Sequence, residues 1–313
     1  MADQETLKHK DLNGRTIAAS INDDLKLKID ELTENDWPPR LVSVTIGDVD
    51  AVGIYVRNQK RTAERIGISF EERHFPAEIT EAEMQAAIQA MNASPHVTGI
   101  IIQRPVPKHL NVKLLQSSIH PLKDVEGLHP ASIGNIVYNE LVLGPCTAMA
   151  SVEMLKRTGL ELPGMEVVVI GHSEIVGKPI AFLLMAEGAT VTVCHHLTRN
   201  LAVHSRQADA VFVAVGKPGL VTGNMIKPGA AVIDIGINQI EGPEGQMLTV
   251  GDCEYESCRD VAGWITPVPG GVGPVTVAML MQNTVTAAHR QMDYYRSEYA
   301  ANAWTTVPEG RGR

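Results

Sequence analysis

The sequence predicts an α/β protein made of two domains, each built on a parallel sheet with helices packed against it. The chain has 313 residues, which is about the length of two ordinary domains. Short runs of β-branched residues alternate with helical segments, and in the second half they recur about every 20 residues. Several runs are continuously apolar, as in strands that are buried on both faces of a parallel sheet.

The first half contains three predicted strands and two predicted helices. They are a strand at Leu41–Ile46, a helix at Ala51–Ile66, a strand at 68–75, a helix at Thr80–Ala93 and a strand at Val97–Ile102. Gly67 is a usual helix stop, and Thr80 is followed by acidic residues, as at a helix start. Residues 103–147 are rich in proline, glycine, histidine and asparagine, which predicts loops with one short helix. Loops after sheet strands commonly carry chemistry.

The second half repeats the alternation with clearer signals. The predicted strands are Glu166–Ile170, Ala189–Cys194, Ala208–Val215 and Ala230–Ile235, with a helix near 178–187 and a last helix near 275–297. This order is typical of a doubly wound sheet that binds a nucleotide.

Composition and charge exclude several function classes. Lys and Arg number 27 against 36 Asp and Glu, so the net charge of −9 lacks the footprint of a nucleic-acid binder. The polar N-terminus has no signal-peptide core, and no apolar run reaches the roughly 20 residues that span a bilayer. The four cysteines lack C-x-x-C spacing, and no zinc-type partner pair accompanies Cys253 and Cys258. We expect a cytoplasmic protein without a nucleic-acid, membrane or metal partner.

The turn from Gly171 to Gly177 is a candidate nucleotide site. It follows a buried strand and opens a helix, which is the context that a dinucleotide-binding turn requires. Ser173 stands at the second glycine of G-x-G-x-x-G, but a hydroxyl and backbone N–H groups at a helix N-terminus can hold an anion. A tight turn without a ligand is the alternative for this motif alone, and the regular strand spacing favours nucleotide binding.

The end of the following strand bears on the kind of cofactor. NAD enzymes usually place an acid there to accept from the ribose 2′-hydroxyl, whereas this strand ends in Cys194-His195-His196 and Arg199 follows. The basic groups and the missing carboxylate favour NADP. Glu174 in the turn leaves NAD open, and the two histidines could also be ordinary loop residues.

A proline- and glycine-rich loop carries the most specific string. Residues Ile265-Thr-Pro-Val-Pro-Gly-Gly-Val-Gly-Pro274 hold three prolines and three glycines, which make a stiff loop that a ligand can approach closely. With VVVIGHSEIVGKPIA, VAVGKPG, VIDIGIN, HPLKDVEGLHP and PCT, this string resembles the methylenetetrahydrofolate dehydrogenase/methenyltetrahydrofolate cyclohydrolase family over about residues 11–290.

The resemblance implies a homodimer of two-domain chains with an interdomain cleft. The α/β folate-binding domain would be residues 1–145, completed by a C-terminal helix at 275–300. A Rossmann-type NAD(P)-binding domain would be 146–274, and 301–313 would be a flexible tail. The implied reactions are hydride transfer from 5,10-methylenetetrahydrofolate to NADP and hydrolysis of the methenyl product to 10-formyltetrahydrofolate.

The resemblance also assigns site residues. Tyr55 would stack on the folate ring system, Gln103 would act in catalysis, and Asp124 would grip the pterin. Pro267, Gly270 and Gly271 would pack against the folate. The implied cofactor-binding residues are Gly171, His172, Ser173, Ile175, Val176, Gly177, His196, Val215, Gly216, Gly236 and Ile237.

The departures from the family pattern affect the predicted mechanism. Gln59 occupies the position of the family's catalytic lysine and cannot supply an ammonium group or move a proton as lysine can. Because general acid–base help is worth about 10²–10⁴-fold, its loss should cost the hydrolytic step most. The sequence therefore predicts an NADP-dependent dehydrogenase with weak or absent cyclohydrolase activity.

Several alternatives stay open. Lys60 could stand in for the lysine, although one helix residue turns a side chain by about 100°. The enzyme could be fully bifunctional. It could also be a non-catalytic folate-binding paralogue or a specialised biosynthetic one, which the further departures at Val52, Arg104, Ala148 and His172 motivate.

Overall fold

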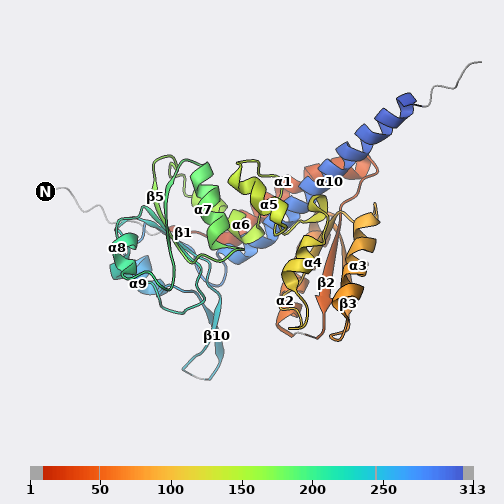
Figure 1. Ribbon diagram of the computed structural model, residues 1–313. Coiled ribbons are helices and arrows are strands. Elements are labelled where there is room, and N and C mark those ends of the chain that lie inside the picture. Colours follow the sequence, from red (N-terminus) through yellow and green to blue (C-terminus); the bar gives the residue numbers. More distant parts are fainter. Residues whose placement is uncertain (1–9, 49, 244, 306–313) are drawn as a thin grey trace, which may run out of the picture. The chain divides into compact units, whose positions relative to one another are not determined.

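The protein divides into two compact units (Figure 1). The computed structural model describes residues 10–48, 50–243 and 245–305. The larger unit contains Glu126–Leu280 and the described residues up to Asp24, and the smaller unit contains Leu25–Val125 and the described residues from Met281 onward. The division falls inside α1 (Gly14–Glu34) and α10 (Val272–Thr305).

These units differ from the limits expected from the sequence, 1–145 and 146–274. The chain before Asp24 belongs to the larger unit because β1 (Lys10–Asp11) pairs with β11 (Trp264–Ile265). Helix α10 contributes residues to both units, whereas the sequence analysis expected it to complete the N-terminal domain, and it continues through residues 301–305 of the expected tail. Residues 306–313 lie outside the described residues.

The larger unit is built on a six-stranded parallel sheet with the order β1-β11-β8-β7-β5-β6. Its remaining strands are β5 (Glu166–Ile170), β6 (Thr190–Cys194), β7 (Ala210–Val213) and β8 (Ala231–Asp234). Strands β7 and β8 are buried along their whole length, which explains their unbroken apolar sequences.

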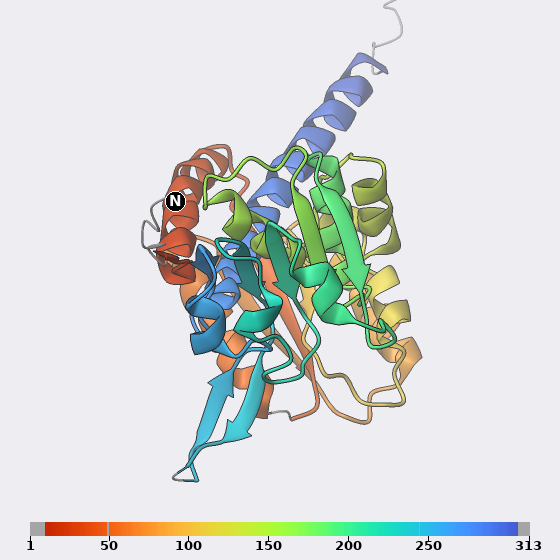
Figure 2. The ribbon, with the colours of Figure 1, turned by 90° about the vertical axis from the view of Figure 1, so that its left-hand side faces the viewer.

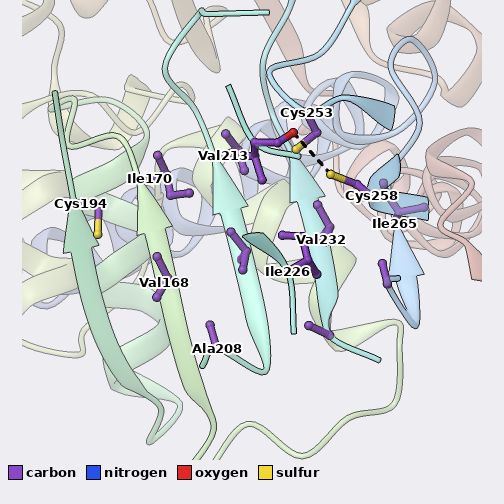
Figure 3. Packing of buried hydrophobic residues seen from close by; sticks show 14 residues of the cluster. Val168, Ile170, Cys194, Ala208, Val213, Ile226, Val232, Cys253, Cys258 and Ile265 are labelled. Carbon is purple, nitrogen blue, oxygen red and sulfur yellow. Dashed lines mark hydrogen bonds between the residues drawn. The ribbon is translucent and has the colours of Figure 1, made fainter. Parts of the chain in front are cut away.

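Helices and short turns cover both faces of this sheet. Helix α7 (Gly177–Ala186) packs on β5 and β6, and α6 (Cys146–Lys156) packs on α7 and β8. A cluster of buried apolar residues in this unit includes Val168, Ile170, Val213 and Val232 (Figure 3). Leu201 of α8 (Leu201–Ser205), Met225 of η2 (Gly223–Met225) and Tyr255 of α9 (Tyr255–Arg259) pack against that cluster.

An antiparallel hairpin extends from the larger unit (Figure 2). It consists of β9 (Asn238–Glu241) and β10 (Met247–Val250) and forms a separate two-stranded sheet. The sequence analysis did not anticipate it, because both strands are short and mostly exposed and so lack an apolar run.

The smaller unit is a three-stranded parallel sheet with the order β3-β2-β4. Its elements are β2 (Arg40–Ile46), α2 (Asp50–Ile66), β3 (Ser69–Phe75), α3 (Glu81–Ala93), β4 (Gly99–Ile102), α4 (Val112–Ser117) and the 3₁₀ turn η1 (Pro121–Lys123). Helix α3 begins with a capping box, because the Thr80 and Glu83 side chains each bond the other's backbone N–H. Its apolar face, Met84, Ile88 and Met91, joins the core against β2 and β4.

The segment 103–147 holds more helix than the one short helix predicted from its composition. Besides α4, it contains α5 (Pro130–Val137) and the start of α6. Some of the residues that suggested loops are helix caps. The Asn111 side chain accepts from Lys113 N, and His129 Nδ1 accepts from Ala131 N.

Within the described residues, no helix is both long and apolar enough to cross a membrane.

Candidate functional site

Gln59 and Gln103, two of the residues that the family resemblance assigns to the folate site, are in direct contact in the smaller unit. Gln103 follows the end of β4, and its Nε2 donates to Gln59 Oε1 at 2.8 Å and to Ser43 Oγ at 3.0 Å. Ser43 is buried in the middle of β2, which is paired with β4. The side chains of Gln59 on α2, Ser43 on β2 and Gln103 after β4 thus form one polar cluster beside an apolar sheet.

Ser43 is a part of this cluster that the sequence analysis missed. Its signal was available, because it is a polar residue inside the strand sequence Leu41-Val-Ser-Val-Thr-Ile46. A buried hydroxyl in such a strand needs a hydrogen-bond partner, and the Gln103 amide is that partner.

Tyr55 lies one helical turn before Gln59 on α2, so the two side chains share one face of the helix. The Tyr55 side chain is 49% exposed, which leaves its ring available for stacking. The side chain of Val52 lies outside the described residues.

Lys60 does not join the Gln59 cluster. Its Nζ lies 2.8 Å from Glu72 Oε1 on β3, and this pairing holds the pKa of Lys60 above its ordinary value. Side chains of neighbouring helix residues point about 100° apart, so the Lys60 side chain is directed toward β3 and Gln59 toward Gln103. In this conformation Lys60 does not replace the missing ammonium group at position 59.

Arg104 is also directed away from Gln59. Its Nη2 donates to Gln116 Oε1 on α4 at 2.6 Å. Neighbouring residues of an extended chain point in opposite directions, so the contact of Gln103 with β2 leaves Arg104 on the other side.

Asp124 is only 2% exposed and is held close to β4 through its backbone, which forms a parallel bridge with Ile100. Helix α10 supports the segment around it. Gln291 Nε2 donates to Leu122 O at 2.9 Å, and Asn283 Nδ2 donates to Val125 O at 2.8 Å. The segment that carries the predicted pterin-binding acid is thus held by the bridge to β4 and by two side chains of α10.

Lys123, the neighbour of Asp124, is a buried cation. Its Nζ donates to Met91 O at 3.0 Å and Ser94 O at 2.6 Å, the carbonyls at the end of α3. Burial lowers the pKa of Lys123 to about 8. Lys123 therefore joins η1 to the end of α3. The sequence analysis did not single out this residue.

The predicted cofactor residues all lie near the carboxyl edge of the sheet in the larger unit. Gly171 follows β5, His196 follows β6, Val215 and Gly216 follow β7, and Gly236 follows β8. Strands β6 and β7 flank β5 on opposite sides, so the order in which successive strands are added to the sheet reverses beside β5. Doubly wound sheets bind ligands at this kind of switch point.

Close backbone approaches explain two glycines of the Gly171–Gly177 turn. A Cβ on Gly171, whose φ is +117°, would lie 2.2 Å from Ala214 O. A Cβ on Gly177 would lie 2.0 Å from Gly171 O. The turn closes on itself, and Ser173 Oγ accepts from the backbone N–H groups of Val176 and Gly177 at 3.2 and 3.4 Å.

Two buried aspartates hold the loops at this edge, and the sequence analysis missed both. Asp252 Oδ2 accepts from Val215 N and Gly216 N at 2.7 and 2.9 Å, and its Oδ1 accepts from Lys217 N at 2.8 Å. Asp234 Oδ1 accepts from Gly236 N at 2.9 Å. Burial raises the pKa of the Asp234 carboxyl above its ordinary value, and its backbone hydrogen bonds oppose that shift.

The surface at this edge includes exposed apolar side chains. Ile175, Val215 and Ile237 are large apolar side chains that remain exposed there. Pockets for such cofactors are mostly apolar, with a few polar groups that fix orientation. The strand end after β6 carries His195 and His196 and no acid, so no carboxylate at this strand end opposes a 2′-phosphate.

The loop Pro267–Gly271 is tied to the start of α1. Gly14 N donates to Gly270 O at 3.0 Å, and a Cβ on Gly14 would lie 1.7 Å from Gly271 O. Gly270 has φ +108°, a conformation that glycine adopts easily. The contact of this loop with folate stays a prediction.

Family models match most of the chain. The model "Tetrahydrofolate dehydrogenase/cyclohydrolase, catalytic domain" matches residues 12–126, and "Tetrahydrofolate dehydrogenase/cyclohydrolase, NAD(P)-binding domain" matches residues 145–292.

Curated relatives and solved structures are similar over nearly the whole chain. "Bifunctional protein FolD 2" of Mesorhizobium japonicum is 67% identical over 84% of this chain and 86% of its own length. "Bifunctional protein FolD" of Rhodobacter capsulatus is 57% identical over 93% of this chain and 97% of its own length. The Trypanosoma brucei methylenetetrahydrofolate dehydrogenase-cyclohydrolase, solved with NADP and an inhibitor, is 36% identical with a TM-score of 0.86, covering 91% of this chain and 98% of that one. The chain belongs to the tetrahydrofolate dehydrogenase/cyclohydrolase family.

Proposed function

We propose that this chain is an NADP-dependent 5,10-methylenetetrahydrofolate dehydrogenase whose cyclohydrolase activity is weak or absent. The observation that carries the proposal is the contact between Gln59 and Gln103. Both groups are neutral amides, and they are hydrogen-bonded to each other at 2.8 Å. The position at which the family resemblance implies an ammonium group therefore holds no charge and no titratable proton.

Hydride transfer needs orientation more than proton chemistry. The carbon that gives up the hydride must be held against the acceptor, and the nitrogen lone pairs of the folate drive the transfer. Bound NADP would supply the hydride acceptor. In this proposal Tyr55 stacks on the folate ring system, and Asp124 and Gln103 fix its polar edge.

The same cofactor is supported by the carboxyl edge of the larger sheet. The Gly171–Gly177 turn, which leads into α7, would approach the pyrophosphate. Val215, Gly216, Gly236 and Ile237 would contact the rest of the dinucleotide, and His172 and His196 would lie near a 2′-phosphate. NAD is the alternative cofactor, and the assay below includes it.

Hydrolysis of the methenyl product makes different demands. A water must be activated, and a proton must reach the leaving nitrogen. The Gln103 amide donates to Gln59 and Ser43, and a neutral amide does not exchange protons near neutral pH. We therefore expect the methenyl product to accumulate.

The test is one assay with two signals on the purified protein. We would supply 5,10-methylenetetrahydrofolate with NADP, and separately with NAD, and follow the reduced cofactor. The methenyl absorbance is followed in the same cuvette against its uncatalysed decay. Reduced cofactor together with accumulating methenyl product supports the proposal, and methenyl decay well above the uncatalysed rate contradicts it.

A matched pair of variants tests the role of position 59. Gln59→Lys should raise methenyl hydrolysis by about 10²–10⁴-fold while changing hydride transfer much less. Asn58→Lys adds the same charge to the exposed neighbour on α2 and should leave hydrolysis unchanged. Equal gains in both variants, or no gain at Gln59→Lys, would reject the assigned role.

A fully bifunctional enzyme is the second candidate. It is favoured by the names of the relatives, which call proteins 67% and 57% identical to this chain bifunctional. In that case Asp124 and Gln103 would suffice for hydrolysis, and the wild-type protein would release 10-formyltetrahydrofolate. Folate binding without either signal would indicate a non-catalytic paralogue, and the absence of folate binding would indicate a specialised paralogue with a modified substrate.

We also propose that the chain acts in the cytoplasm as a homodimer, as the family resemblance implies. Light scattering on the purified protein tests the dimer. A mass near twice 33.8 kDa supports it, and a mass near 33.8 kDa contradicts it.

A further inference from the structure

Three histidines lie together at the carboxyl edge of the larger sheet. One ring nitrogen from each of His172, His195 and His196 lies within 4.8 Å of the others. In the part of the chain that the structure describes, this is the one group of three or more potential metal-ligating side chains. The rings of His172 and His195 stack with their centroids 4.8 Å apart, and the His196 centroid lies 5.9 Å from that of His195.

The backbone fixes this arrangement. His172 follows β5 and the other two follow β6, and these strands are neighbours with Ile170 opposite Cys194. Gly171 N donates to Cys194 O at 2.9 Å, which continues the pairing to the residues before His172 and His195. His195 is further held by Thr198, whose Oγ1 accepts from His195 N at 2.9 Å. The cluster therefore follows from strand register rather than from a chance meeting of long loops.

We propose that His172, His195 and His196 bind one divalent transition-metal ion, with water in the remaining position. Three imidazoles without a carboxylate favour Zn²⁺, Ni²⁺, Co²⁺ or Cu²⁺ over Mg²⁺ and Ca²⁺, which prefer oxygen ligands. Three protein ligands and one open position form a common zinc arrangement.

The side chains can close onto an ion without a change in the backbone. Zinc–nitrogen bonds are about 2.0–2.1 Å, so ligand atoms in a tetrahedral site lie about 3.4 Å apart. His172 and His196 are exposed, and rotation of their side chains can bring the nitrogens from 4.8 Å to this separation.

One existing bond must be exchanged on binding. Leu197 N donates to His195 Nδ1 at 3.2 Å, so this nitrogen now acts as an acceptor. Coordination through Nδ1 replaces that bond, and coordination through Nε2 moves the ring proton to Nδ1. Either way the Leu197 N–H turns to solvent, which the exposure of Leu197 permits.

This site shares His172 and His196 with the proposed cofactor site, but its test needs no cofactor. Chelator-treated protein is titrated with Co²⁺ and with Zn²⁺, using calorimetry for both and visible absorption for Co²⁺. We expect one ion per chain and the d–d bands of a four-coordinate cobalt site without a thiolate charge-transfer band. Absence of saturable binding by the folded protein rejects the site, whatever the enzyme assay shows.

Single variants assign the ligands. His172→Ala, His195→Ala and His196→Ala should each weaken binding by at least about tenfold, because each removes one of three ligands. His204→Ala, an exposed histidine on α8 outside the cluster, is the matched control and should bind as the wild type does. Circular dichroism establishes that each variant is folded. Unchanged binding in the three cluster variants, or equal weakening in the control, would overturn the proposal.

Discussion

The buried side chains of Asp234 and Asp252 are linked: the Asp234 carboxylate accepts from the backbone of Asp252, and the Asp252 carboxylate accepts from the backbone of another loop. Asp252 N donates to Asp234 Oδ1 at 3.0 Å, and the Asp252 side chain in turn accepts from the backbone of Val215, Gly216 and Lys217. Asp252 Oδ1 also accepts from Asn238 Nδ2 at 2.9 Å, which ties the base of the β9–β10 hairpin to the same group. Two acids thus set the conformation of the loops after β7 and β8.

Asp252→Asn should destabilise the protein by about 2–4 kcal/mol, because an NH₂ group would face backbone N–H donors in a buried site. It should also weaken NADP binding, since Val215 and Gly216 lose the group that orders them. Urea unfolding and fluorescence titration with NADP measure the two effects. Asp260→Asn, at an exposed residue that ends α9, should change stability by less than about 0.5 kcal/mol. Equal effects from both substitutions would show that Asp252 does not have this role.

Lys123 should make stability depend on alkaline pH. Burial lowers its pKa to about 8 in the folded protein from the ordinary value of 10.5, so between these values the unfolded chain binds more protons. Stability contributed through this group therefore rises as the pH increases from about 8 to about 10.5. It falls over the same range as the pH decreases, and it does not change further below about 8, where both states bind the proton. A neutral amine still has two N–H groups for Met91 O and Ser94 O.

The measurement is the free energy of unfolding of wild type, Lys123→Met and Lys108→Met at pH values from 7 to 10. Wild type should gain stability relative to Lys123→Met as the pH rises, and it should stay parallel to Lys108→Met, which changes an exposed lysine. Parallel curves for wild type and Lys123→Met would show that the buried cation does not titrate in this range.

Gly177→Ala should disrupt the cofactor turn. The added methyl group would lie 2.0 Å from Gly171 O, and both partners are backbone, so the turn must open. We expect a loss of at least about 2 kcal/mol in stability and a loss of NADP binding, measured by thermal unfolding and fluorescence. Gly134→Ala in α5 meets no atom within 4 Å and should stabilise the helix by up to about 1 kcal/mol. Similar behaviour of the two variants would contradict the steric argument.

Several structural elements could be predicted from local sequence signals. The apolar runs at Glu166–Ile170 and 230–235 mark buried strands to within two residues, and the Thr80 capping box marks the start of α3. Helix α1 was missed although its signal was present. Its buried residues recur at helical spacing, namely Ala18, Ile21, Leu25, Ile29 and Leu32.

The sequence by itself determined the alternation of strands and helices, the family to which the chain belongs and the identity of residue 59. These follow from patterns that extend over a few residues or from literal strings. Only the tertiary structure decided that Gln59 pairs with Gln103 while Lys60 pairs with Glu72, and that Asp252 orders a loop 35 residues earlier in the chain. The reason is physical. Each of these contacts joins residues that the packing of different elements brings together, and local sequence does not identify the partner that a side chain meets there.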